Sequence, residues 1–386
     1  METHVHPSDS NLEAATHGRN FGIDCLRGLA IVLVIVHHLA LPFRLPLGPS
    51  LLRDWVPNRL LDALSINGYE AVFIFFVISG FLIARRIIDV DGDLARVRLR
   101  RFYAARAWRI LPLLLCILAV LAVLALLGVP GFAPDPNVQS TGGLLASALS
   151  LTFNWYEGRT GWAPAGWDVL WSLSIEEAFY LGFPLLCLGL PRRILVGVLL
   201  AWALCLAPLR ELVPASSEVW REKAYLPGMA ALAWGVLAAM LSVHWRPDAR
   251  GARLLALVGS LGIFMALGWE RLLHRLFNGA SLYLLCVGAC CMLLGFAARP
   301  PRARRALVPL ARMGALSYEL YLSHMFIVLA VVAGYRALLG EVQAWTFVVY
   351  LPVLVLCLAL ATGLQKLGAA FTRRGARPVA PAREAA

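Results

Sequence analysis

The fold of this chain is decided by residues 24–38, which read DCLRGLAIVLVIVHH. In an α-helix of about 100° per residue, Arg27 and His38 lie on one stripe, because the eleven positions that separate them amount to three turns plus roughly 20°. Along the axis they are about 16 Å apart, close to half of a ~30 Å hydrocarbon core. We therefore expect Arg27 at one membrane face and His38 near the midplane. A polar side chain at such depth costs free energy and indicates a functional site.

The composition indicates an integral membrane protein. The 386 residues are 60% hydrophobic and only 15% charged, with a mean hydropathy of +0.72, whereas soluble proteins carry about 25% charged residues. The net charge of +12 is typical of arginines in cytoplasmic loops, and no basic patch accompanies a soluble domain, which argues against nucleic-acid binding. All eight cysteines lie in apolar stretches without a CxxC motif, which predicts neither a metal site nor disulfides.

The hydropathy pattern predicts an all-α integral membrane protein, a polytopic bundle of about ten transmembrane helices. The expected spans are 22–41, 69–88, 108–129, 170–190, 193–210, 225–243, 252–270, 278–297, 314–335 and 343–367. Connections on one side, such as 89–107 and 298–313, hold most of the loop arginines, which predicts that both termini are cytoplasmic. We thus expect a cytoplasmic tail over 1–21, a transmembrane domain over 22–371 and a disordered cytoplasmic tail over 372–386.

Polar motifs in the second span and before the third each leave two interpretations open. Ser79-Gly80 is typical of close helix packing, but Ser79 is also a candidate site residue. Arg106 and Arg109 lie one turn apart in the lead-in to the third span. They either mark the cytoplasmic side and contact lipid headgroups, or they hold an anionic cytoplasmic ligand such as a nucleotide phosphate.

The span 170–190 carries polar residues on one face. Ser172, Glu176 and Tyr180 are spaced i, i+4 and i+8. Because Glu176 and Glu177 are adjacent, we expect that they do not both face the bundle interior, and that one is protonated, paired or near water. A carboxylate in this setting can act as a general base or acid, whereas the alternative is an interfacial glutamate near water.

A second intramembrane histidine occurs in the span 314–335. Ser317, Tyr321 and His324 are spaced i, i+4 and i+7 on one stripe. Because this span and the first run in the same direction, His324 is expected at a depth similar to that of His38. Such a histidine is either a site residue or a structural residue that hydrogen-bonds between helices.

Five motifs occur in order along the chain. They are Arg-x10-His from Arg27 to His38, Phe-Phe-x-x-Ser-Gly-Phe from Phe75 to Phe81, Arg-x-x-Arg-Ile-x-Pro from Arg106 to Pro112, Trp-Ser-Leu-x-x-Glu-x-x-Phe-Tyr from Trp171 to Tyr180, and Gly-x-x-Ser-Tyr-x-x-Tyr-Leu-x-His from Gly314 to His324. With them the chain resembles the membrane-bound acyltransferase family 3, the ten-helix integral membrane O-acyltransferases of bacterial surface carbohydrates. The resemblance runs from about Ile23 to Phe371.

The resemblance implies transfer of an acyl group, most often acetyl from acetyl-CoA, to a hydroxyl of a carbohydrate. The acceptor would be a lipid-linked or nascent glycan at the outer face of the bacterial cytoplasmic (inner) membrane. Acyl-CoA would be a co-substrate, with no bound cofactor and no metal. Charge placement fits this reaction independently, because Arg27, Arg106 and Arg109 gather at the predicted cytoplasmic face, where the phosphates of CoA would bind.

Each polar position then receives a predicted role. Arg27, Arg106, Arg109 and Ser79 are expected to bind the donor, and Arg27 also belongs to the predicted catalytic set. His38 is expected to deprotonate the attacking hydroxyl, the alternative being an acyl-histidine, and Glu176 is expected to orient or deprotonate the acceptor. The predicted channel or acceptor-lining residues are Trp171, Ser172, Tyr180, Tyr318, Tyr321 and His324.

Two other classes of function stay open. A transporter or flippase for an anionic or lipid-linked substrate would also place arginines at one face and polar groups at the midplane, but it would leave acetyl-CoA unconsumed. A non-catalytic partner in a membrane assembly would tolerate the replacement of His38 or Arg27. The sequence predicts no particular oligomeric state.

Overall fold

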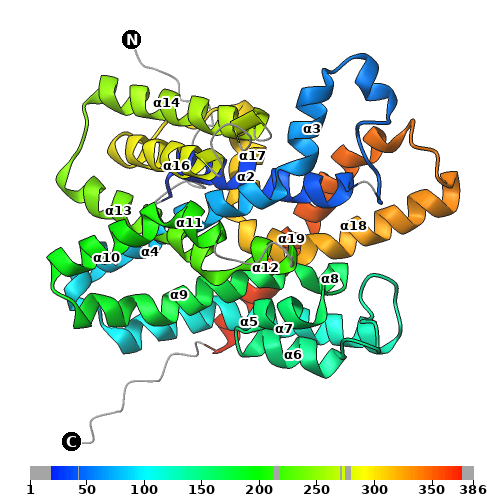
Figure 1. Cartoon of the computed structure of the whole chain (residues 1–386), viewed down its shortest axis with the longest axis horizontal. Coiled ribbons are helices and arrows are strands. Elements are labelled where there is room, and N and C mark those ends of the chain that lie inside the picture. Colours follow the sequence, from blue (N-terminus) through cyan, green and yellow to red (C-terminus); the bar gives the residue numbers. More distant parts are fainter. Residues whose placement is uncertain (1–18, 42, 212–217, 270–271, 274–279, 376–386) are drawn as a thin grey trace, which may run out of the picture.

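The chain folds into a bundle of helices. The computed structural model describes residues 19–41, 43–211, 218–269, 272–273 and 280–375, which form helices and no strand. Nine stretches of these residues are long and apolar enough to cross a membrane. Their main helices are α2 (Phe21–Ala40), α4 (Gly68–Asp91), α5 (Leu99–Leu126), α9 (Leu170–Gly189), α13 (Tyr225–His244), α14 (Ala249–Gly268), α16 (Ala280–Ala298), α18 (Ser317–Leu339) and α19 (Tyr350–Gly375) (Figure 1). The predicted all-α polytopic membrane bundle is confirmed.

The fifth predicted span, 193–210, is interrupted. It forms two shorter helices, α10 (Arg192–Leu204) and α11 (Leu206–Glu211). Pro208 explains the break, because a proline ring clashes with the carbonyl group four residues earlier. That carbonyl, of Leu204, instead accepts a hydrogen bond from the Tyr283 hydroxyl. With 13 residues, α10 rises only about 20 Å and does not cross a ~30 Å core by itself.

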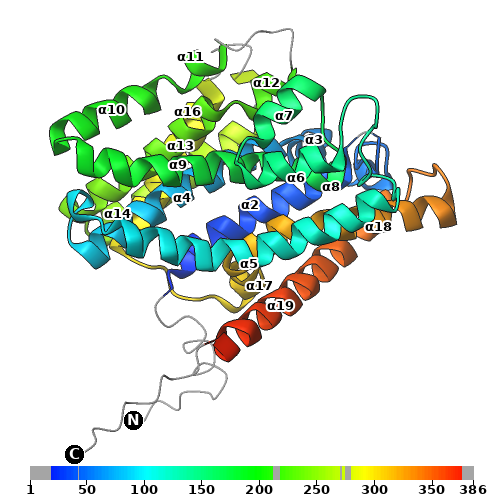
Figure 2. The same cartoon turned by 90° about the horizontal axis from the view of Figure 1, so that it is seen from below.

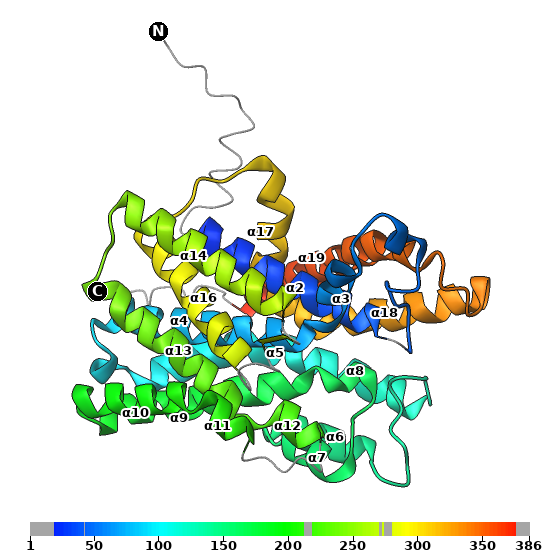
Figure 3. The same ribbon diagram turned by 45° about the horizontal axis from the view of Figure 1, so that its top comes forward.

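Glycines let two pairs of helices approach each other at backbone distance. A Cβ atom added to Gly314, on α17 (Val308–Ala315), would lie 1.8 Å from the Asp24 carbonyl oxygen of α2. A Cβ atom added to Gly80 of α4 would lie 2.0 Å from the Leu232 carbonyl oxygen of α13. Figure 3 shows α17 against α2. Close packing, one of the two interpretations of Ser79-Gly80, is therefore confirmed for its glycine.

Short helices gather at the end of the bundle opposite the arginine-rich connection between α4 and α5 (Figure 2). They are α6 (Thr141–Leu149), α7 (Phe153–Thr160), α8 (Ala165–Asp168) and α12 (Glu218–Lys223). The Lys223 ammonium joins three of them, because it lies 2.7 Å from the Glu157 carboxylate and also contacts that of Asp168. Burial of Glu157, reinforced by the charge of Asp168, raises the pKa of the Glu157 carboxyl well above its ordinary value.

We expect Gly314→Ala to lower the free energy of unfolding by at least ~1–3 kcal/mol, because the added methyl group forces α17 away from α2. Thermal unfolding of the purified protein in detergent measures the effect. Gly363→Ala on α19 is the matched control, since a Cβ atom there meets nothing within 4 Å. Equal unfolding temperatures for the two variants would contradict the close approach.

Candidate active site

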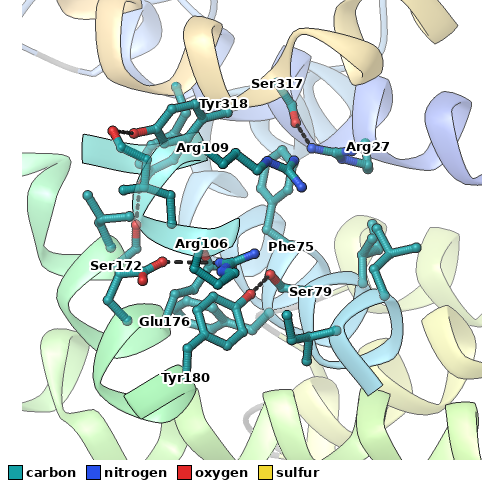
Figure 4. A pocket seen from close by; sticks show the side chains of 18 of the residues that line it. Arg27, Phe75, Ser79, Arg106, Arg109, Ser172, Glu176, Tyr180, Ser317 and Tyr318 are labelled. Carbon is teal, nitrogen blue, oxygen red and sulfur yellow. Dashed lines mark hydrogen bonds and ion pairs between the residues drawn. The ribbon is translucent and has the colours of Figure 1, made fainter. Parts of the chain in front are cut away.

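One cavity of about 140 Å³ lies between α2, α4, α5, α9 and α18. Its polar lining residues, most of them drawn in Figure 4, are Arg27, Ser79, Arg86, Arg106, Arg109, Ser172, Glu176, Glu177, Tyr180, Ser317, Tyr318 and Tyr321. The structure thus brings together every predicted site residue except His38, Trp171 and His324.

Arg106 is held inside the cavity on two sides. Its guanidinium donates to the Glu177 carboxylate at 3.1 Å, and its Cζ lies 3.8 Å from the centroid of the Tyr180 ring. Both side chains of the ion pair are largely buried, with 18% and 16% of their surface exposed. The buried Nε of Arg106 has no hydrogen-bond partner among the described residues. An arginine that only marked the cytoplasmic side would instead lie in a solvated loop.

Arg27 and Arg109 face each other in the cavity. Arg27 donates to the Ser317 hydroxyl at 2.6 Å, and Figure 4 shows Arg109 reaching from α5 toward Arg27. Within the part of the chain that the structure describes, neither guanidinium forms an ion pair. Two like charges in this arrangement repel each other, and an anion between them would offset the repulsion while accepting charge-assisted hydrogen bonds. The arrangement is therefore suited to bind an anionic group.

The polar face predicted on α9 is confirmed. Ser172, Glu176 and Tyr180 all line the cavity. The Ser172 hydroxyl donates to the Tyr321 hydroxyl at 2.7 Å, and the hydroxyls of Tyr180 and Ser79 are hydrogen-bonded to each other. Ser79 thus faces the cavity, while the glycine that follows it packs against α13.

The expectation that Glu176 and Glu177 do not both face the interior is wrong, because both line the cavity. Adjacent helical residues point about 100° apart, and the cavity spans a wide enough arc of α9 to receive both. The second half of the expectation holds, since Glu177 is paired with Arg106.

His38 and His324 do not line the cavity, but their rings are in contact with each other. Their ring centroids are 5.1 Å apart, and the Tyr321 ring, which does line the cavity, lies 6.0 Å from that of His324. This contact confirms that the two histidines lie at similar depth. His38 is in the last turn of α2, since that helix ends at Ala40.

The family model of the acyltransferase domain, that of acyltransferase family 3, matches residues 20–364. The chain belongs to this family. Its polar cavity, at the crossing of the five motif-bearing helices, is accordingly the candidate active site of an acyltransferase domain.

Relatives of this chain include O-acetyltransferase OatA of Staphylococcus aureus, strains NCTC 8325 / PS 47 and COL. Each is 24% identical over 352 residues, which cover 85% of this chain and 53% of the relative. The chain therefore spans about half the length of these curated relatives. No solved structure matches the chain significantly.

The structure adds lining residues that the sequence pattern did not assign to the site. Arg86 lies beside Arg85 at the predicted cytoplasmic end of α4, where the sequence indicates only which side of the membrane this end faces. In the structure Arg86 lines the cavity. Ser317 was apparent only as the first position of a polar stripe. Trp171, which was expected to line the channel, instead packs its ring against those of Tyr69 and Phe76, each 6.2 Å away.

We expect Arg106→Met to destabilise the protein more than the double variant Arg106→Met/Glu177→Gln. The single change leaves the Glu177 carboxylate unpaired in a largely buried place, whereas the double change removes both charges. A double-mutant cycle on thermal unfolding in detergent should give a coupling energy of ~0.5–3 kcal/mol. Arg101→Met, at an exposed position of the same helix, is the control, and strictly additive effects would contradict the pairing.

Proposed function

We propose that this protein transfers an acetyl group from acetyl-CoA, bound from the cytoplasmic side, to a hydroxyl of a carbohydrate or lipid-linked glycan at the outer side. The observation that carries the proposal is the cavity in which Arg27 and Arg109 face each other, neither of them ion-paired with any described residue. Membership of the acyltransferase family and the relatives named O-acetyltransferase support the same reaction.

The donor site follows from charge and size. CoA carries several phosphate charges, and four arginines line the cavity: Arg27, Arg86, Arg106 and Arg109. The cavity of about 140 Å³ is smaller than the roughly 300–1,000 Å³ of pockets that enclose a whole drug-sized ligand. It suits a narrow pantetheine arm with its thioester, while the nucleotide stays at the arginine-lined mouth.

The orientation rests on the loop arginines. The lead-in to α5 and the connection before α17 carry most of them, and such loops lie in the cytoplasm. We infer that the protein spans the bacterial cytoplasmic (inner) membrane with both termini inside. The arginine-lined end of the cavity then faces the compartment that contains acetyl-CoA.

The chemistry is general-base catalysis. Nδ1 of His38 lies 2.8 Å from the Val34 carbonyl oxygen, which can only accept, so Nδ1 carries the proton and Nε2 holds a lone pair. Nε2 takes the proton of the acceptor hydroxyl as its oxygen attacks the thioester carbonyl carbon. The C–S bond breaks, and the CoA thiolate leaves and receives the proton from His38. Glu176, on the cavity wall, orients the acceptor or the thioester.

Membranes that contain the protein, supplied with labelled acetyl-CoA, test the proposal. We expect release of free CoA thiol together with alkali-labile label in the carbohydrate fraction. His38→Ala and Glu176→Gln should each lower this transfer by ~10²–10⁴-fold. Binding of acetyl-CoA without thiol release would contradict the proposal and favour a carrier.

We expect Arg109→Ala to raise the KM for acetyl-CoA by ~10–100-fold with little change in kcat, because a charge-assisted bond to a phosphate contributes about 1.5–3 kcal/mol to ground state and transition state alike. Steady-state kinetics at fixed membrane concentration measure the change. Arg101→Ala, an exposed arginine on the same helix, should leave KM unaltered. An unchanged KM in Arg109→Ala would contradict donor binding by this residue and would indicate that it only marks the cytoplasmic side of the membrane.

A further inference from the structure

A groove of about 740 Å³ lies between the beginning of α14 and the end of α16, two helices that run side by side (Figure 1). No described residue lines both this groove and the candidate active site. The described residues that line the groove include four arginines, Arg253, Arg299, Arg302 and Arg304, and no carboxylate. The groove therefore concentrates positive charge at a place that the proposed reaction does not use.

These four arginines are exposed and have no partner of opposite charge. Within the part of the chain that the structure describes, none of their side chains forms an ion pair or a hydrogen bond. The carboxylate of Asp248 is close along the chain but caps α14, where it accepts from the Gly251 backbone N–H at 2.8 Å. Like charges around one groove repel each other, and an anion among them would offset that repulsion. The groove is suited to an anionic ligand.

Close backbone contacts give the groove a fixed shape. A Cβ atom added to Gly295 of α16 would lie 2.7 Å from the carbonyl oxygen of Ala252 on α14, and both residues line the groove. The connection that follows α16 is held against α2, because a Cβ atom added to Gly22 would lie 2.8 Å from Cγ of Pro301. Pro301 directly precedes Arg302. A groove that is formed in advance lowers the entropic cost of binding a ligand.

The apolar wall of the groove leads into the membrane-spanning part of α14. Ala249, Ala252 and Ala256 are spaced i, i+3 and i+7 on one stripe and line the groove along about 10 Å of the helix axis. Leu257, one turn after Arg253, has 67% of its surface exposed, as expected of a side chain that faces lipid. The charged end of the groove is thus continuous with a lipid-facing surface.

We propose that this groove binds an anionic phospholipid, with the arginines on its phosphate groups and the alanine stripe along one acyl chain. Arginine binds phosphate oxygens in a bidentate manner, and basic pockets between membrane spans are typical sites for such headgroups. A soluble phosphate compound would use the arginines but not the stripe that enters the membrane. In the proposed orientation the lipid belongs to the cytoplasmic leaflet. The inference goes beyond the proposed acetyl transfer and does not depend on it.

Titration of the purified full chain, in a nonionic detergent, with diphosphatidylglycerol tests the proposal, with native mass spectrometry as the measure of bound lipid. We expect Arg299→Gln/Arg302→Gln to raise the Kd by ~10–100-fold, because each arginine near an anionic headgroup contributes roughly fivefold to the affinity. The lipid should also raise the unfolding temperature of the unmodified protein and raise that of this variant less.

The matched control is Arg246→Gln/Arg250→Gln. It removes the same charge from exposed arginines at the same end of the bundle that do not line the groove. Its Kd should stay within about twofold of that of the unmodified protein, since only general attraction to the anionic lipid is reduced. Equal losses of affinity in the two double variants would overturn the proposal, because the arginines would then act only through the net charge of this end.

Soluble competitors distinguish a lipid site from a site for free phosphate. We expect that neither inorganic phosphate, nor CoA, nor the deacylated headgroup displaces diphosphatidylglycerol at a tenfold molar excess (~10:1), and that the zwitterionic phosphatidylcholine binds at least ~10-fold more weakly. Displacement by any of the three soluble compounds would overturn the lipid assignment and indicate a soluble phosphate ligand. Because lipid binding is measured without turnover, a failure of the acetyl-transfer assay would leave this result unchanged.

Discussion

A largely buried ion pair between Arg106 and Glu177 constrains the whole bundle. Each charge in an apolar surrounding costs several kcal/mol, which the ion pair offsets and, for Arg106, the contact with the Tyr180 ring as well. The pair requires that α5 and α9 turn these side chains toward each other across the cavity. The lipid side of α5 is then left to residues such as Leu115, Val123 and Leu126, all of them exposed. The cavity side of α5 is therefore polar and its lipid side apolar.

Two glycines allow neighbouring helices to approach closely beside the cavity. Gly314 lets α17 approach the backbone of α2, and the chain then continues into α18 with Ser317 next to Arg27. Gly80 brings α4 against α13 and leaves the preceding residue, Ser79, facing the cavity. In a membrane no hydrophobic effect drives helices together, so the packing gained at these small residues supports the polar face beside them.

Much of this arrangement could be predicted from the sequence, because helical periodicity controls which residues share a face. The polar face of α9 and the similar depth of His38 and His324 follow from helical spacing and from the direction of the spans. The break in the span 193–210 occurs at a single proline, whose effect a hydropathy window averages out. The carbonyl that the break frees is bonded by a tyrosine of a distant helix, which the window does not include. The second carboxylate, Glu177, was misjudged because its partner Arg106 lies on another helix, and spacing within one helix carries no information about such partners.

The position of Tyr321 defines how a donor and an acceptor could meet. This residue lines the cavity with the arginines, accepts from Ser172, and has its ring centroid 6.0 Å from that of His324. A cavity of about 140 Å³ leaves no room for a carbohydrate beside a pantetheine arm. In the proposed reaction the acceptor therefore approaches the histidines from the end of the bundle where α8 lies. The thioester and the hydroxyl then meet at Tyr321, each having entered from its own side of the membrane.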